Sequence, residues 1–181
     1  WVFDPQAWRL AQHQAGANGG WGDNSRTQFA LLGLKAAEDL GVLVPAEVFE
    51  KARKYVEAGQ GADGGWSYAP GRKQPSYGSM SAAGIASLFI CGARLYRGTK
   101  VCGQGASDAR LVKGLEWLAQ NFSVRTNPNT GSVSYHHYYL YGLERIGVLL
   151  AQKPIGGHDW YREGAEYLVR SQFPDGSWGS E

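Results

Sequence analysis

Tyrosine and histidine side chains gather at two places in this chain of 181 residues. Each group stands where an apolar segment begins, and each side chain combines a ring with a hydrogen-bonding group. That combination suits a pocket for a small molecule, although such rings also pack between neighbouring helices. Both interpretations stay open for the residues that could line a site, which are Tyr68, Tyr77, Tyr135, His136 and His137, with Tyr138, Tyr139 and Tyr141 beside them.

The cysteines and histidines do not have the spacing of a metal site. Cys91 and Cys102 have no histidine at the separation that zinc ligands show along a chain. His136 and His137 are adjacent, so on a helix they point about 100° apart and cannot bind one ion together. We therefore expect no metal and no cofactor. The cysteines are either two free thiols or one local disulfide bridge.

The charged residues do not indicate a nucleic-acid partner. The formal net charge is +2, from 18 basic and 16 acidic side chains, and the sequence has no basic run. The stretch 79–93 is uncharged, but it is short and rich in Ser, Gly and Ala, so we expect a buried helix and no membrane span. No targeting sequence is visible, and the compartment stays unknown.

Helices must position the candidate residues, because helix-start and helix-stop residues punctuate the chain. Asp4-Pro5, Pro45 and Ser107-Asp108 are typical of helix starts, and Gly41 of a helix end. Together with the apolar periodicity, these signals predict seven helices. Their approximate ranges are 4–14, 25–40, 45–59, 76–96, 107–121, 135–151 and 159–172.

The predicted helices alternate between two kinds. Those at 45–59, 107–121 and 159–172 have one apolar face and one charged face. Those at 25–40, 76–96 and 135–151 contain stretches that are apolar on every side, which predicts that they are buried. Glu144 and Arg145 interrupt the last of these, and we expect each to need a partner of its own, since adjacent helical residues do not face each other. The alternation predicts an outer and an inner layer of helices.

A short signature recurs four times, and its tryptophan position is occupied by Trp21, Trp66, Val133 and Trp178. The first and last intervals are 45 residues each, and the middle interval is 67. A fixed period of this length indicates a helical repeat protein. Within each copy, glycines permit a sharp reversal, Asp or Asn accepts turn N–H groups, Gln bonds backbone at a helix end, and Trp wedges between repeats. Val133 predicts looser packing at the third junction.

The stretch from Arg162 to Trp178 closely resembles the QW repeat of squalene and hopene cyclases, and Lys51 to Trp66 matches it more loosely. Nearly the whole chain resembles the prenyltransferase and squalene-oxidase repeat group, and stretches 138–145 and 157–164 resemble bacterial members of unassigned function. The resemblance implies an all-α fold of the α/α toroid type, a double-layered helical repeat. With about seven helices, residues 1–181 would form a single domain, an open arc or partial ring, as a fragment of a longer protein.

The resemblance also implies where chemistry could occur. In the cyclases an Asp-rich motif protonates the substrate, and its best match here is Asp23-Asn24-Ser25-Arg26-Thr27, where Ser25 and Arg26 replace the two key acids. Asp23 and Arg26 therefore become candidate substrate-binding residues without a proton donor. No Asp-x-Cys pattern suggests the zinc site of protein prenyltransferases, and Cys102 and Gln104 lie two positions apart rather than the three that a thioester needs.

Three functions follow as hypotheses. The first is a non-catalytic binding or scaffolding module of a larger bacterial protein, which takes a peptide, glycan or lipid-like small molecule on its concave face. The alternative is an enzyme of the terpene cyclase or polysaccharide lyase type, with catalytic residues supplied from outside this fragment. The third is self-association through the apolar ends of an open arc.

Overall fold

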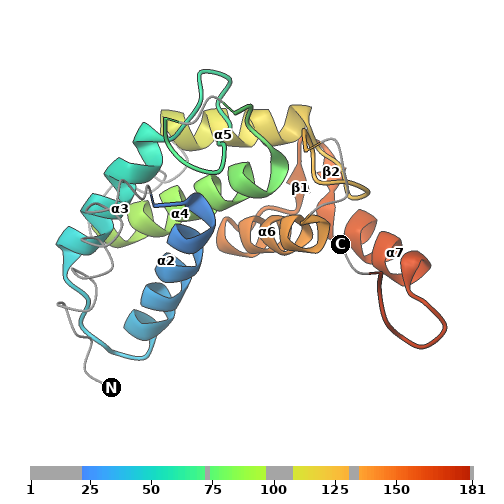
Figure 1. The fold of residues 1–181 in the computed structure, drawn as a ribbon. Coiled ribbons are helices and arrows are strands. Elements are labelled where there is room, and N and C mark those ends of the chain that lie inside the picture. Colours follow the sequence, from blue (N-terminus) through green and yellow to red (C-terminus); the bar gives the residue numbers. More distant parts are fainter. Residues whose placement is uncertain (1–21, 72–73, 97–107, 131–134, 180–181) are drawn as a thin grey trace.

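The computed structural model describes residues 22–71, 74–96, 108–130 and 135–179, and most of them are helical (Figure 1). The expected helix at 4–14, the first signature and Val133 lie outside the described residues. The six helices of the described part begin and end within two residues of their predicted bounds. In order, the elements are α2 (Asn24–Asp39), α3 (Ala46–Ala58), α4 (Gly78–Leu95), α5 (Ala109–Gln120), α6 (His136–Leu149), β1 (Pro154–Ile155), β2 (His158–Asp159) and α7 (Trp160–Ser171).

Aspartates cap three of the helices. The Oδ1 atoms of Asp23, Asp108 and Asp159 accept hydrogen bonds from backbone N–H groups in the first turns of α2, α5 and α7, at 2.8–3.0 Å. Each bond satisfies one of the donors that a helix start leaves without a partner. The α2 helix ends just before Gly41, whose φ of 85° is the left-handed conformation that glycine adopts without strain.

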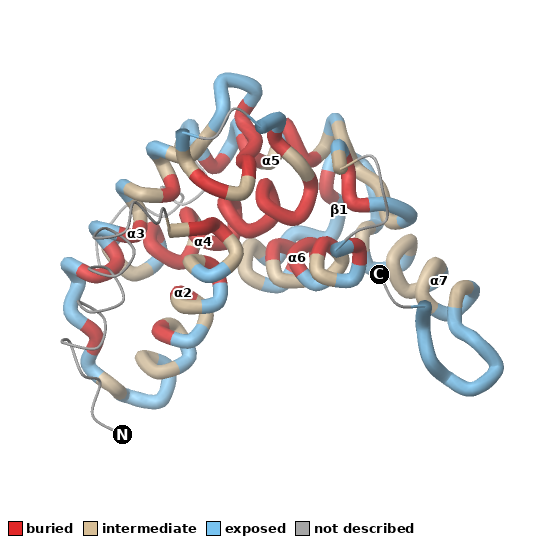
Figure 2. The backbone as a smooth tube through the Cα atoms, in the orientation of Figure 1, coloured by how far each residue is buried: buried red, intermediate tan, exposed pale blue. Residues whose placement is uncertain are grey.

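The α4 helix is the centre of the fold. It contacts α2, α3, α5 and α6, and 14 of its 18 residues are buried (Figure 2). The larger apolar core gathers around Trp66 between α4, α5 and α6, and a smaller core gathers around Phe49 between α2, α3 and the end of α4. The prediction of an uncharged buried helix in this region is confirmed.

All-round burial of the helices on either side of α4 was a wrong expectation. Phe29 on α2 is 53% exposed, and Tyr141 and Val148 on α6 are 37% and 58% exposed. The reason is position: α4 has helices on both sides, whereas α2 and α6 each have α4 on one side. Their open faces carry several of the rings that the sequence placed in a candidate site.

The second signature forms a compact turn between α3 and α4. Gln60 Nε2 donates to Gly64 O at 2.8 Å, and Asp63 Oδ1 accepts the Gly65 N–H at 3.2 Å. The Trp66 indole N–H donates to Val56 O at 2.8 Å, and the ring is fully buried in the larger core. The roles predicted for Asp and Trp in the signature are therefore confirmed in this copy, whereas the Gln60 side chain bonds a carbonyl within the turn and not the backbone at the end of α3.

Glu144 and Arg145 correct a second expectation. Each was expected to need its own partner, but the two side chains form a forked ion pair with each other. Both are about one-third exposed, so their flexible stems can bend together outside the packed interior. The Arg145 guanidinium also lies 5.4 Å from the centre of the Tyr141 ring.

A short hairpin that the sequence analysis did not predict links α6 to α7. Strands β1 and β2 pair antiparallel across Gly156 and Gly157, whose φ angles are 59° and 86°. Ile155 in this hairpin is buried in the larger core, whereas none of the twelve residues of α7 is buried. The α7 helix packs mainly on α6 and β2 and extends away from the other helices (Figure 1).

By length and composition alone, α4 is the one helix of the described ranges that could cross a membrane. However, most of this helix is buried against the rest of the chain. An apolar helix in that position is accounted for by the core that it forms.

Candidate functional site

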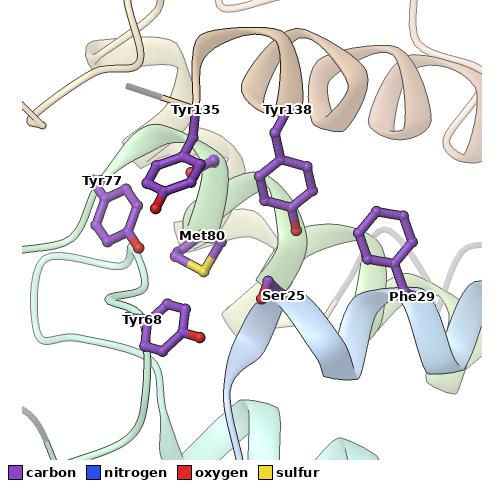
Figure 3. A pocket seen from close by; sticks show the side chains of 8 residues that line it. Ser25, Phe29, Tyr68, Tyr77, Met80, Tyr135 and Tyr138 are labelled. Atoms are coloured by element: carbon purple, nitrogen blue, oxygen red, sulfur yellow. The ribbon is translucent and has the colours of Figure 1, made fainter. Parts of the chain in front are cut away.

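A pocket of about 380 Å³ opens where the starts of α2, α4 and α6 meet. Aromatic side chains dominate its wall, and the rings of four tyrosines surround Met80 (Figure 3). Its volume falls in the usual range of small-molecule sites. The described residues that line it are Ser25, Phe29, Tyr68, Tyr77, Ser79, Met80, Tyr135 and Tyr138.

Backbone bonds fasten the loop that carries Tyr68 to the start of α2. The Asn24 N–H donates to Tyr68 O at 3.0 Å, and the Asn24 side chain donates to Ser67 O at 2.7 Å. Ser25 and Phe29 follow one turn apart on the same helix and therefore share a face. This connection brings residues of two distant segments to one wall of the pocket.

Asn127 holds the start of α4 in place. Its Oδ1 accepts the Ser79 N–H at 2.8 Å, and its Nδ2 lies 3.1 Å from Ser79 Oγ. The neighbouring Gly78 is packed so closely that a Cβ there would lie 2.4 Å from Pro128 Cδ. Glycine is therefore required at the point where Tyr77 and Ser79 enter the pocket wall.

Tyr135 stands at the start of α6 in a left-handed backbone conformation, with φ 56° and ψ 29°. This conformation is uncommon for a bulky residue and costs about 1–2 kcal/mol relative to the ordinary helical region. The ring is 67% exposed, so burial of apolar surface contributes little to holding it there. Strained residues of this kind concentrate at ligand sites.

Tyr138 joins α6 to α2 across the pocket. Its hydroxyl donates to Gln28 Oε1 at 2.6 Å, and its ring stacks on Phe29 with 5.8 Å between ring centres. Burial first, and the charge of Asp23 second, raise the pKa of Tyr138 above its ordinary value. The phenol is therefore neutral at any physiological pH.

None of the eight described residues that line the pocket carries a formal charge. The nearest established charge is that of Asp23, which is only 3% exposed and acts on Tyr138 from the α2 N-cap. Its Oδ1 accepts bonds from the Arg26 N–H and the Ser25 hydroxyl, and its Oδ2 lies 3.1 Å from Arg26 Nε. The carboxylate is therefore paired with a guanidinium, and the two charges largely offset each other at the site.

Three of the seven candidate residues line the pocket, namely Tyr68, Tyr77 and Tyr135. The other four do not: Asp23 lies behind Ser25 as a helix cap, and the Arg26 side chain is 86% exposed. His136 is buried on another side of α6, with Nε2 3.0 Å from Val124 O and its ring edge against Tyr167. The His137 side chain is exposed.

Of the other five lining residues, the sequence analysis placed Tyr138 in the tyrosine cluster but not among the seven candidates, and it did not select Ser25, Phe29, Ser79 or Met80 for the site. The tyrosine run contained a signal for Tyr138, and the one-turn spacing of Ser25 and Phe29 was a weak signal for a shared face. Behind them, Asn24 Oδ1 and Gln28 Nε2 are buried with no hydrogen-bond partner in the described structure. Such atoms are rare in folded proteins, and ordered water often accounts for them.

Among the described residues, no group of three His, Cys, Asp or Glu side chains is placed to hold a metal ion. Cys91 is a buried free thiol, and burial raises its pKa to about 12, so it is not a reactive nucleophile. Cys102 lies outside the described residues. Comparison with protein families, curated proteins and solved structures finds no match to this chain.

Proposed function

We propose that this chain is a non-catalytic binding module and that its ligand site is the tyrosine-lined pocket between α2, α4 and α6. The observation that carries this proposal is the meeting of four tyrosines, from three separate segments, around one uncharged pocket. Largely apolar pockets with a few hydrogen-bonding groups are the usual form of small-molecule sites.

The proposal includes the architecture, which we infer to be an arc of the α/α toroid type, as the QW-like stretches suggest. In its support, α4 lies between α2 and α6, and α3 and α5 both pack on α4. The helices α3, α5 and α7 have the one-sided pattern of an outer layer. In this arrangement the starts of α2, α4 and α6, where the pocket lies, belong to the inner layer. A scaffolding role within a larger bacterial protein stays a prediction.

The lining selects for an uncharged ligand. The phenol and serine hydroxyls can donate or accept hydrogen bonds, and the rings offer apolar faces. A carboxylate or phosphate would meet no cation in the described lining, so no ion pair would offset the loss of its hydration. The fitting classes are therefore a neutral glycan, a lipid-like alcohol or an uncharged peptide segment.

Non-catalytic binding is favoured over the cyclase or lyase alternative by the contacts that already engage Asp23, the acid beside the pocket. Asp23 already accepts hydrogen bonds from a backbone N–H and a serine hydroxyl, and it pairs with Arg26. Asp23 is therefore engaged as the N-cap of α2, and the described residues that line the pocket include no carboxylic acid that could serve as the proton donor of cyclase chemistry.

The test is titration of the chain with three uncharged probes: a disaccharide, a short isoprenoid alcohol and a capped dipeptide. We expect one class to bind, as followed by NMR and calorimetry. The substitution Tyr135→Gly should weaken that binding by about tenfold or more, because a ring in a pocket contributes of the order of 1–3 kcal/mol. The same substitution should leave the free energy of unfolding unchanged or raise it by up to ~1 kcal/mol, because glycine relieves the left-handed strain.

Two controls make the result specific to the pocket. Tyr161→Phe removes a phenol hydroxyl from exposed α7 and should leave binding unchanged, whereas Tyr138→Phe removes the bond to Gln28 and should weaken binding. Preferential binding of a short-chain carboxylate would contradict the proposal. So would equal effects of Tyr138→Phe and Tyr161→Phe.

A further inference from the structure

The fourth signature folds into the same turn as the second. Gln172 Nε2 donates to Gly176 O at 2.8 Å, and Asp175 Oδ1 accepts the Ser177 N–H at 2.9 Å. The Trp178 indole N–H donates to Leu168 O at 2.9 Å, ten residues back, as Trp66 donates to Val56. Each residue of α3 and the turn after it therefore corresponds to the residue 112 positions later, in α7 and the turn after it.

In the second copy, two following helices cover the tryptophan. A Cβ on Gly84 of α4 would lie 2.3 Å from the Trp66 ring, and one on Gly114 of α5 would lie 2.9 Å from it. Ser81, one turn before Gly84, accepts the backbone N–H of Trp66 at 3.1 Å. The indole thus fits between two glycine positions that are separated by a whole helix–helix connection.

Polar bonds complete this cover. The Trp117 indole N–H on α5 donates to Asp63 Oδ2 at 3.0 Å, and Gln60 Nε2 donates to Arg110 O at 2.8 Å. At the helix itself, Phe49 of α3 is fully buried against the end of α4. The second turn and α3 therefore form one continuous surface that the pair α4–α5 covers.

The corresponding surface of the fourth copy is open. Trp178 is 42% exposed, and Tyr161, which corresponds to Phe49, is 68% exposed. Phe173 is 51% exposed and Asp175 lies at the surface beside it. The side chains that are buried in the second copy are thus exposed at the corresponding positions of the fourth copy.

We propose that the surface formed by Tyr161, Phe173, Asp175 and Trp178 is a docking site for a partner that supplies a helix pair of the α4–α5 kind. The first partner helix carries Ser-x-x-Gly. Its glycine packs against the Trp178 ring, and its serine hydroxyl accepts the backbone N–H of Trp178. The second carries Gly-x-x-Trp, in the spacing of Gly114 and Trp117, and its indole N–H donates to Asp175.

One difference between the two copies further restricts the sequence that the partner needs. Arg53 of α3 pairs with Asp108 at the start of α5, whereas Ala165 occupies the corresponding position on α7. The docking site therefore requires no acidic residue at the start of the second partner helix. An added acidic residue there should not strengthen binding, which distinguishes this partner from an exact copy of α4–α5.

The experiment uses the 181-residue chain and, as probe, a peptide of residues 74–122, which contains both template helices. Calorimetry measures binding, and hydrogen exchange reports on the amides of residues 172–178. We expect 1:1 binding that protects these amides, and a loss of at least about tenfold in affinity for Trp178→Ala. A probe with Gly84→Leu should bind at least about tenfold more weakly. The probe with Asp108→Asn, which removes the charge and keeps a side chain that can cap α5, should bind as well as the parent probe.

A fusion that carries residues 74–122 after Glu181 on a flexible linker repeats the test within one molecule, in case the free probe is poorly soluble. Protection of residues 172–178 in the fusion, lost with Trp178→Ala, would support the proposal. Unprotected amides in the fusion, or probe binding that Trp178→Ala does not change, would overturn it. Sedimentation of the chain alone completes the design: dimers that Trp178→Ala abolishes would overturn it in favour of a second copy as occupant.

Discussion

The turns at 60–66 and 172–178 have the same hydrogen bonds but opposite surroundings. Both have the Gln side-chain bond to a turn carbonyl, the Asp bond to a turn N–H and the indole bond to a carbonyl ten residues back. Yet Trp66 is fully buried and Trp178 is 42% exposed. The turn is therefore a local structure that forms without its cover, and the burial of its tryptophan depends on the helices that follow.

The largest effect is expected from removing each indole. Trp66→Ala should lower the free energy of unfolding by about 3–5 kcal/mol, because it leaves a cavity between α4 and α5 and removes the indole hydrogen bond to Val56 O. Trp178→Ala should cost about 1 kcal/mol or less, since that ring is partly solvated and its main bond is a single hydrogen bond. Chemical denaturation of both variants measures the difference, and equal losses would show that the turn at 172–178 is buried in solution.

A methyl group tests the same contrast more gently. Gly84→Ala places its Cβ 2.3 Å from the Trp66 ring and should cost about 1–3 kcal/mol through overpacking. Gly164→Ala on α7 meets nothing within 4 Å and should raise stability by up to about 1 kcal/mol, because alanine favours the helix. Calorimetry of thermal unfolding compares the two variants. Destabilisation by Gly164→Ala would show that another segment packs against α7 at this position.

The smallest effect concerns pH. Hydrogen bonds from the Ser177 backbone N–H and hydroxyl hold the pKa of Asp175 below its ordinary value. The sign follows: the contribution to stability is present above the ordinary aspartate pKa and is lost as the pH falls through the lowered one. NMR titration of the carboxyl should show the lowered pKa, and Ser177→Ala should raise it partway. An unshifted Asp175 would mean that the uncovered turn is not formed.

Helix bounds and turns were the most predictable features because their causes are local. Asp108 and Asp159 were identified as helix starts, and each accepts the N–H bond that makes it one. The signature predicts that its Asp accepts a turn N–H, and Asp63 accepts that of Gly65. The hairpin at 154–159 was missed, although Gly156-Gly157 between two short segments is a typical hairpin signal.

The candidate site was less predictable because its residues come from distant segments. Tyr68, Tyr77 and Tyr135 were found because the sequence places them at or near predicted helix starts, and all three line the pocket. His136 follows Tyr135 directly, but one residue of rotation on a helix sends it to another side. The side of a helix on which a residue packs, and the segments that it meets there, cannot be predicted from residue spacing within one segment.

Gln28 and Tyr138 lie 110 residues apart in the chain, and their hydrogen bond spans the pocket. A contact of this separation closes a long loop, whereas α4 finds α3 and α5 among its immediate neighbours in the chain. Folding should therefore begin around Trp66, with the pocket wall completed after the main barrier. Substitutions at Tyr138 should accelerate unfolding and leave the refolding rate nearly unchanged, so the site would be the last part of the molecule to form and the first to open.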